Sequence, residues 1–184
     1  MLTWLWVIIV VAALVVLMFL YYYNKFVLLG NRIDNSLSQI DVQLKRRADL
    51  IPNLIETVKG YAKHEKGIMA EVSKARQAMV SAKDIPKKVA ANNVLENALG
   101  RLFAIAENYP DLKANTNFLQ LQQELTATED KVAYSRQFYN DSILSYNNSA
   151  ATFPGNIFAS IYGKQAKEYL KIAEAERQVP KVDF

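Results

Sequence analysis

The chain has 184 residues, a formal net charge of +4 and no cysteine. The absence of cysteine excludes disulfides, thiolate metal sites and a lipid-modified N-terminal cysteine. The residues after the first 24 carry every charged side chain, at the density of an ordinary globular domain, and their modest, dispersed positive charge gives little support to nucleic-acid binding.

The first 24 residues predict one membrane-spanning helix. Residues 2–20 are apolar apart from Thr3, and at about 1.5 Å per residue they reach across a hydrocarbon core of about 30 Å. Aromatic rings settle at headgroup level and mark both ends; the predicted anchor residues are Trp4, Trp6, Tyr21, Tyr22 and Tyr23. A cleaved signal peptide is the alternative, but the segment lacks a basic start and a small-residue cleavage pattern.

The charges around the span predict its orientation. Lys25 and Arg32 follow it closely, whereas only the terminal amine precedes it. The positive-inside rule then places the N-terminus outside and the remaining chain in the cytoplasm. The uncharged N-terminal tail is short, so the opposite orientation stays open.

Apolar positions three and four apart predict helices throughout the rest of the chain, with no support for strands. The first helix continues from the membrane to about residue 47, with a break or kink expected at 47–50, where Asp49 and Pro52 could start a new helix. Further helices are expected at 51–81, 87–107, 118–146 and 157–162, and residues 165–177 are helix-capable.

This pattern predicts an all-α fold. A transmembrane helix continues into an antiparallel bundle of about four long helices, followed by a short C-terminal helix. The expected domains are an anchor at 1–24, a helical bundle at 25–163 and a helical or extended tail at 164–184.

Three blocks of sequence closely resemble the signature of the bacterial LemA family. They are IDVQLKRRADLIPNLIETVKGYAKHE at 40–65, RQFYNDSILSYN at 136–147 and FPGNIFASIYG at 153–163, with PKVDF closing the chain. The resemblance implies a bacterial plasma-membrane protein built on a long antiparallel helix pair. It supplies no activity, because the family has no established chemistry. Some members look like outward-facing lipoproteins, and this chain departs from them in lacking cysteine.

The chain lacks the residue sets of common catalytic and cofactor sites. His64 is the only histidine and has no partner ligands at metal-binding spacing, which favours a place on a polar helix face. The glycines are scattered and form no phosphate-binding loop. We therefore expect no enzyme activity, no metal and no cofactor.

Eight polar or aromatic residues are candidates for an interface: Arg46, Arg47, Asn53, Tyr139, Asn140, Tyr146, Asn147 and Phe153. The two arginines could bind phosphates or anionic lipid, but a solvated face or pairing within the helix with Asp41 and Asp49 is favoured. Asn53 could tie helices together or face a partner. The Phe153 segment predicts a turn, and an exposed phenylalanine there would suggest docking.

Tyr139-Asn140 and Tyr146-Asn147 recur seven residues apart, which places the tyrosines on one helix face and the asparagines on the next. These polar groups could find partners within the core, or they could select a register or a partner across a helical interface.

Together these features predict a non-enzymatic scaffold, anchored in the lipid bilayer by one span and self-assembling as a homo-oligomer. The alternative is an adaptor or regulator of another membrane protein, such as an envelope-stress protease, that does not self-assemble.

Overall fold

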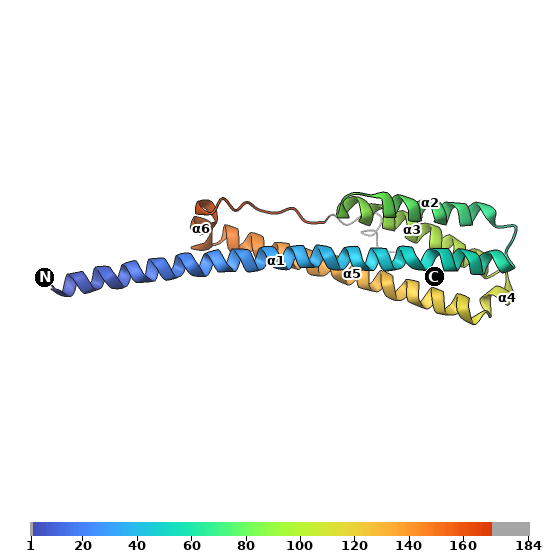
Figure 1. Cartoon of the computed structure of the whole chain (residues 1–184), viewed down its shortest axis with the longest axis horizontal. Helices are drawn as coiled ribbons and strands as arrows, with labels where there is room; N and C mark the ends of the chain where they lie inside the picture. The colour runs from blue at the N-terminus through green and yellow to red at the C-terminus, as the bar shows by residue number, and fades with distance from the viewer. Residues whose placement is uncertain (1, 171–184) are drawn as a thin grey trace, which may run out of the picture. The chain divides into compact units, whose positions relative to one another are not determined.

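The computed structural model describes residues 2–170, which contain six helices and no strand (Figure 1). The helices are α1 (Leu2–Tyr61), α2 (Lys66–Ser81), α3 (Ile85–Ala106), α4 (Pro110–Lys113), α5 (Thr116–Ala151) and α6 (Gly155–Ile161). The all-α prediction is confirmed. Residues 164–170 are not helical, and the remainder of the helix-capable stretch, like the closing PKVDF, lies outside the described residues.

The described chain divides into two compact units. The N-terminal unit comprises residues 2–36 and 137–169, and the bundle unit comprises residues 37–136 and Leu170. Helices α1 and α5 each contribute residues to both units. The division predicted from sequence into anchor, bundle and tail stays a prediction.

In the N-terminal unit, α1 and α5 run antiparallel and α6 packs against both (Figure 1). The buried core residues of this unit recur every three or four positions along α1, as expected for one buried helix face. The buried members are Phe26, Leu29 and Ile33 from α1, Ile143 and Tyr146 from α5, and Phe158 and Ala159 from α6. Further along, Ser36 and Ser142 face each other with their hydroxyl oxygens 3.4 Å apart.

In the bundle unit, four helical segments surround an aliphatic core. They are residues 37–61 of α1, α2, α3 and residues 116–136 of α5. Fully buried side chains come from every segment and include Ile40, Leu44, Ile51, Leu54, Val72, Met79, Leu95, Leu99, Leu102, Leu125 and Val132. Local signals set the helix starts: the Asp84 carboxylate accepts the backbone N–H of Lys87 at α3, and the Asn115 side chain accepts that of Phe118 at α5.

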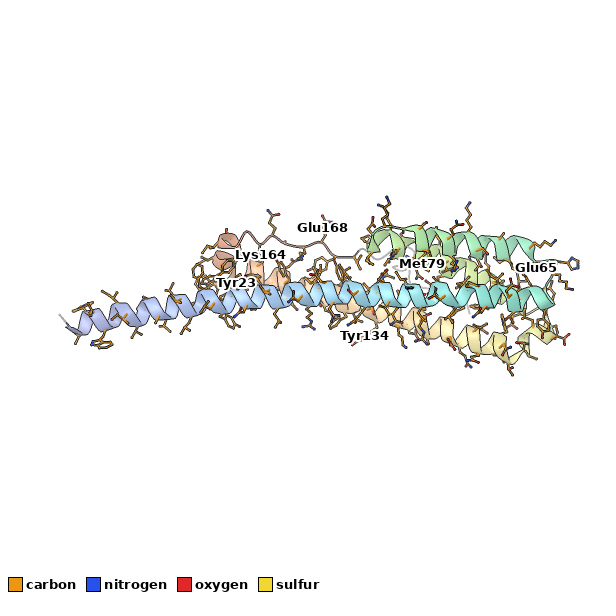
Figure 2. The ribbon with its side chains drawn as sticks, viewed as in Figure 1. Tyr23, Glu65, Met79, Tyr134, Lys164 and Glu168 are labelled. Carbon is orange, nitrogen blue, oxygen red and sulfur yellow. The ribbon has the colours of Figure 1, made fainter. Side chains whose placement is uncertain are left out.

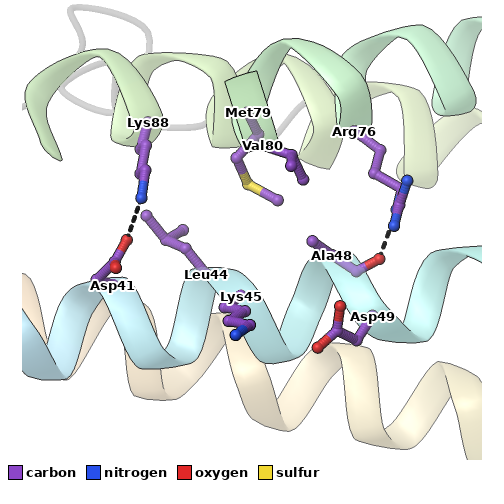
Figure 3. Close-up of a pocket in the computed structure, with 9 residues that line it drawn as sticks. All are labelled: Asp41, Leu44, Lys45, Ala48, Asp49, Arg76, Met79, Val80 and Lys88. Carbon is purple, nitrogen blue, oxygen red and sulfur yellow. Dashed lines mark hydrogen bonds and ion pairs between the residues drawn. The ribbon is translucent and has the colours of Figure 1, made fainter. Parts of the chain in front are cut away.

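Helix α1 passes through residues 47–50 without the predicted interruption and ends at Tyr61. Pro52 lies inside it and has no N–H to give to the carbonyl of Ala48, four residues earlier. The Arg76 side chain of α2 donates its Nε–H to that carbonyl at 2.7 Å (Figure 3). The prediction of a break was wrong because a residue distant in sequence replaces the missing donor.

Replacing Arg76 should therefore lower the free energy of unfolding, chiefly because the Ala48 carbonyl loses its hydrogen-bond donor. Arg76→Met keeps most of the alkyl stem and leaves a buried carbonyl unpaired, so the free energy of unfolding should fall by about 1.5–3 kcal/mol. In a Pro52→Ala background, residue 52 regains its N–H and the same substitution should cost much less. Denaturant unfolding in detergent, followed by circular dichroism, measures both values. Lys74→Met, at an exposed position of α2, is the control. Equal costs in both backgrounds would show that Arg76 acts elsewhere.

Candidate functional site

The N-terminal part of α1 is apolar, and residues 3–21 are all exposed. An 18-residue window in it has a mean hydropathy of 2.8, and none of that window is buried. Figure 2 shows its side chains pointing outward on all sides. This is one candidate membrane-spanning segment. Of the predicted anchor residues, Trp4, Trp6, Tyr21 and Tyr23 are exposed, whereas Tyr22 is half-buried against α6.

An aromatic cluster joins the end of this apolar segment to α6. We use the name for Phe19, Tyr22, Tyr23, Phe26, Tyr146, Phe158 and Tyr162. The Phe158 ring stacks on Tyr22 with centroids 4.7 Å apart and meets Phe19 edge-on at 5.2 Å. The Tyr162 hydroxyl donates to the backbone carbonyl of Phe19 at 2.7 Å. These contacts fix α6 at the level of Phe19 and Tyr22 on α1.

Gly155, the first residue of α6, makes this docking sterically possible. A Cβ atom there would lie 2.1 Å from the Ser149 carbonyl oxygen of α5 and 3.2 Å from the Tyr22 ring. The carbonyl is close because the chain turns back between α5 and α6, and the ring is close because α6 packs against α1. The short closing helix was predicted, but the requirement for glycine was not.

The Tyr-Asn pairs of α5 find partners inside the N-terminal unit. Tyr146 is only 4% exposed, and its ring meets Phe26 edge-on at 5.7 Å; burial raises the pKa of its hydroxyl. Tyr139 and Asn140 are half-buried, and the pKa of Tyr139 is raised by burial and then by the nearby charge of Asp34. The Asn147 amide donates to the Lys167 carbonyl at 2.9 Å and accepts the Lys167 N–H at 2.8 Å. An intermolecular role for these residues stays a prediction.

Phe153, Arg46 and Asn53 are exposed. Phe153 lies in the turn before α6 and is 81% exposed, more than any other large hydrophobic side chain in the described part of the chain. Arg46 and Asn53 project from the α1 segment of the bundle unit. Their exposure leaves them available to a partner and does not identify one.

Arg47 is buried in the bundle unit, contrary to the expectation of a solvated face or of pairing with Asp41 and Asp49. The residue is 3% exposed and forms an ion pair with Glu129 of α5. Burial lowers the pKa of its guanidinium to about 10, and the charge of Glu96 on α3 opposes that shift. The group therefore remains protonated at neutral pH. Asp41 instead pairs with Lys88 of α3 at 2.5 Å. The sequence could not show this, because both partners lie on other helices.

Asn92 of α3 was missed by the sequence reasoning. It is fully buried, and neither amide atom has a hydrogen-bond partner among the described residues. It lies three residues after Val89 and three before Leu95, both buried. A polar residue on an apolar stripe is the signal that could have identified it.

A small cavity of about 200 Å³ lies between α1 and α2 in the bundle unit, with one lining residue from α3 (Figure 3). Apolar walls come from Leu44, Ala48, Met79 and Val80, and charged walls from Asp41, Lys45, Asp49, Arg76 and Lys88. Two of the charged side chains already bond across it, Lys88 to Asp41 and Arg76 to the Ala48 carbonyl. Among the described residues, no group of three or more His, Asp or Glu side chains could hold a metal ion.

The fold and the exposed apolar segment define a membrane-associated helical protein. Residues 36–184 match the LemA family, and the chain belongs to that family. Three curated relatives are similar at low identity. Magnetosome protein MamQ 2 of Paramagnetospirillum magneticum (strain AMB-1) is 26% identical over 81% of this chain, and magnetosome protein MamQ of Magnetospirillum gryphiswaldense is 27% identical over 80%. The chain spans 64% of the length of each of these two proteins. Protein LemA of Metamycoplasma hominis is 27% identical over 80% of this chain and 68% of its own length.

Gly155→Ala should displace α6. The new Cβ collides with a backbone carbonyl that cannot move cheaply, so we expect the free energy of unfolding to fall by about 1–3 kcal/mol. Gly30→Ala is the matched control, because a Cβ at Gly30 meets nothing within 4 Å in the same unit and should stabilise α1 by up to about 1 kcal/mol. Denaturant unfolding in detergent compares the two. A neutral effect at Gly155 would contradict the close packing.

Glu129→Ala should leave the buried Arg47 charge poorly compensated and lower the free energy of unfolding by about 3 kcal/mol. Replacing the pair together, Arg47→Met with Glu129→Leu, should restore most of that loss. The pKa of Arg47 is lower in the folded than in the unfolded state, so burying the charged group lowers the free energy of unfolding at neutral pH. This cost becomes smaller as the pH rises above about 10, where the folded protein loses the proton first. Unfolding of the variants at pH 7 measures the first two effects. A double variant as unstable as Glu129→Ala would refute this account.

Proposed function

We propose that this protein is a non-enzymatic scaffold tethered to the bacterial plasma membrane by one N-terminal span and assembled there as a homo-oligomer. The observation that carries the proposal is the apolar start of α1, in which residues 3–21 are all exposed and which continues as the same helix into folded, charged sequence. A surface of this kind is stable in hydrocarbon and costly in water. The lipid bilayer is its natural partner.

The charged groups of the bundle unit support a structural role. Arg47 pairs with Glu129, Lys88 pairs with Asp41, and Arg76 completes the backbone of α1. Each contact joins two helices and so stabilises the fold. Asp41, Lys88 and Arg76 also line the small cavity, where each is already engaged in one of these contacts.

Self-assembly is favoured by confinement and by the surface of the bundle unit. Anchoring in two dimensions raises the effective concentration of copies, so that weak contacts become useful. Large apolar side chains are exposed on α1, α2, α3 and α5 of this unit. Among them are Val42 on α1, Val94 on α3 and Tyr134 on α5, the last labelled in Figure 2. Such side chains on two copies of the chain could pack against each other directly.

The charge pattern favours an orientation with the bundle unit in the cytoplasm. Lys25 and Arg32 follow the apolar segment, and no acidic residue precedes Asp34. Protease protection of sealed membrane vesicles tests this directly, because only the exposed side is digested.

Photocrosslinking in intact bacterial membranes tests the scaffold against the adaptor. A photoreactive residue at Tyr134 or Val94 should yield crosslinks between copies of the chain, whereas the same group at buried Leu99 is the control and should yield none. Mass measurement in nanodiscs should give more than one copy per particle. Monomers at all concentrations, with one stoichiometric foreign protein crosslinked, would instead establish the adaptor.

A further inference from the structure

We propose that α6 and the turn before it form a second membrane contact, in which Phe153, Ile157 and Ile161 enter the boundary between acyl chains and headgroups of an anionic leaflet. The partner is the bilayer surface at the end of the N-terminal span. This inference rests on the membrane anchor of the proposed function.

The position of α6 along α1 sets its depth. Phe19 lies 16 residues after Thr3, which is about 24 Å along a helix, and a hydrocarbon core is about 30 Å thick. With Trp4 at one interface, Phe19 to Tyr22 lie about 23 to 27 Å along the helix, at the margin of the hydrocarbon core next to the other interface. Phe158 and Tyr162 touch those same residues, so α6 is held at the depth where acyl chains give way to headgroups.

The side chains of α6 divide between the protein and its exterior. Gly155, Phe158 and Ala159 are buried against α1 and α5. Ile157 and Ile161 lie one turn apart and are 50% and 55% exposed, and Phe153 precedes them in the turn. A helix docked by one face that presents isoleucines on another is the pattern of an interfacial helix. This surface adjoins the exposed apolar surface of α1, which the span already places in lipid.

The charge of the surrounding sequence fits an anionic leaflet. From Ser142 to Lys167 there is no aspartate or glutamate, although two lysines occur there. Lys164 is exposed shortly after α6 and lies on the same side of α1 as α6 in Figure 2. The Lys25 ammonium lies 5.6 Å from the centroid of the Tyr22 ring. Basic residues beside a shallow apolar surface bind anionic headgroups, each adding to membrane affinity.

Single cysteines can report the depth of this surface without background, because the natural chain has none. The full-length variants Phe153→Cys, Ile157→Cys and Ile161→Cys carry the environment-sensitive NBD fluorophore in nanodiscs of phosphatidylglycerol and phosphatidylethanolamine. Val10→Cys in the apolar segment reports the anchor itself. Leu144→Cys is the matched control, since Leu144 is also about half exposed in this unit and lies on α5, two residues before the Tyr146 that contacts Phe26. Far-UV circular dichroism checks that each variant is folded.

We expect NBD emission at all three α6 positions to shift to the blue and to be lost when nitroxide-labelled lipids are included, with no loss at Leu144. Replacing phosphatidylglycerol with phosphatidylcholine should reduce the loss at the α6 positions and leave Val10 unchanged. If Val10 is quenched by lipid but the α6 positions are quenched by aqueous iodide, the second contact is wrong and the anchor stands. Protection from both quenchers would show that a protein covers the surface and would overturn the lipid assignment. No lipid quenching at Val10 would refute the proposed anchor itself.

Discussion

Every backbone carbonyl of α1 needs a hydrogen-bond donor, both in the apolar segment and in the bundle unit. In the apolar segment the helix supplies these donors alone, since every interior carbonyl has its own N–H four residues later. In the bundle unit the ladder lacks one donor at Pro52, and Arg76 supplies it from another helix. An unpaired buried carbonyl at that point would favour a broken helix, and the residues on either side could not then share one continuous apolar face. The long helix therefore depends on α2 as well as on its own sequence.

Packing in the N-terminal unit obeys a related constraint, because α6 has only seven residues and cannot be stable alone. Its stability comes from large aromatic surfaces on α1 and from the absence of a side chain at Gly155, which lets its first turn approach the α5 backbone. The bundle unit uses buried ion pairing as well. Arg47 carries a charge into a core where its removal from water is costly, and Glu129 and Glu96 partly offset that cost. Neither unit relies on a single type of contact.

Much of this architecture follows from local pattern. The exposed apolar segment, the helices near 85–106 and 116–151, and the closing helix follow from hydropathy, periodicity and capping, which act within a few residues. The failures were of a different kind. Continuity at 47–50, the burial of Arg47 and the role of Gly155 each depend on a residue tens of positions away, and no local rule encodes such a partner. Asn92 was predictable only in part. The sequence shows that it lies on an apolar stripe, but it does not show that its amide lacks a partner among the described residues.

The reciprocal bonds between Asn147 and Lys167 have a consequence for the segment after α6. A side-chain amide that donates to the carbonyl and accepts from the N–H of one residue acts as a neighbouring β-strand residue would. Residues 164–169 thereby gain one pair of sheet-like hydrogen bonds without a strand beside them. Aspartate at position 147 would lack the donor, and glutamine would carry its amide one methylene too far. This pair of hydrogen bonds also fixes the alignment of the extended segment along α5. If α5 slid or rotated by one residue, this amide would turn away and the extended segment would lose its alignment with the helix.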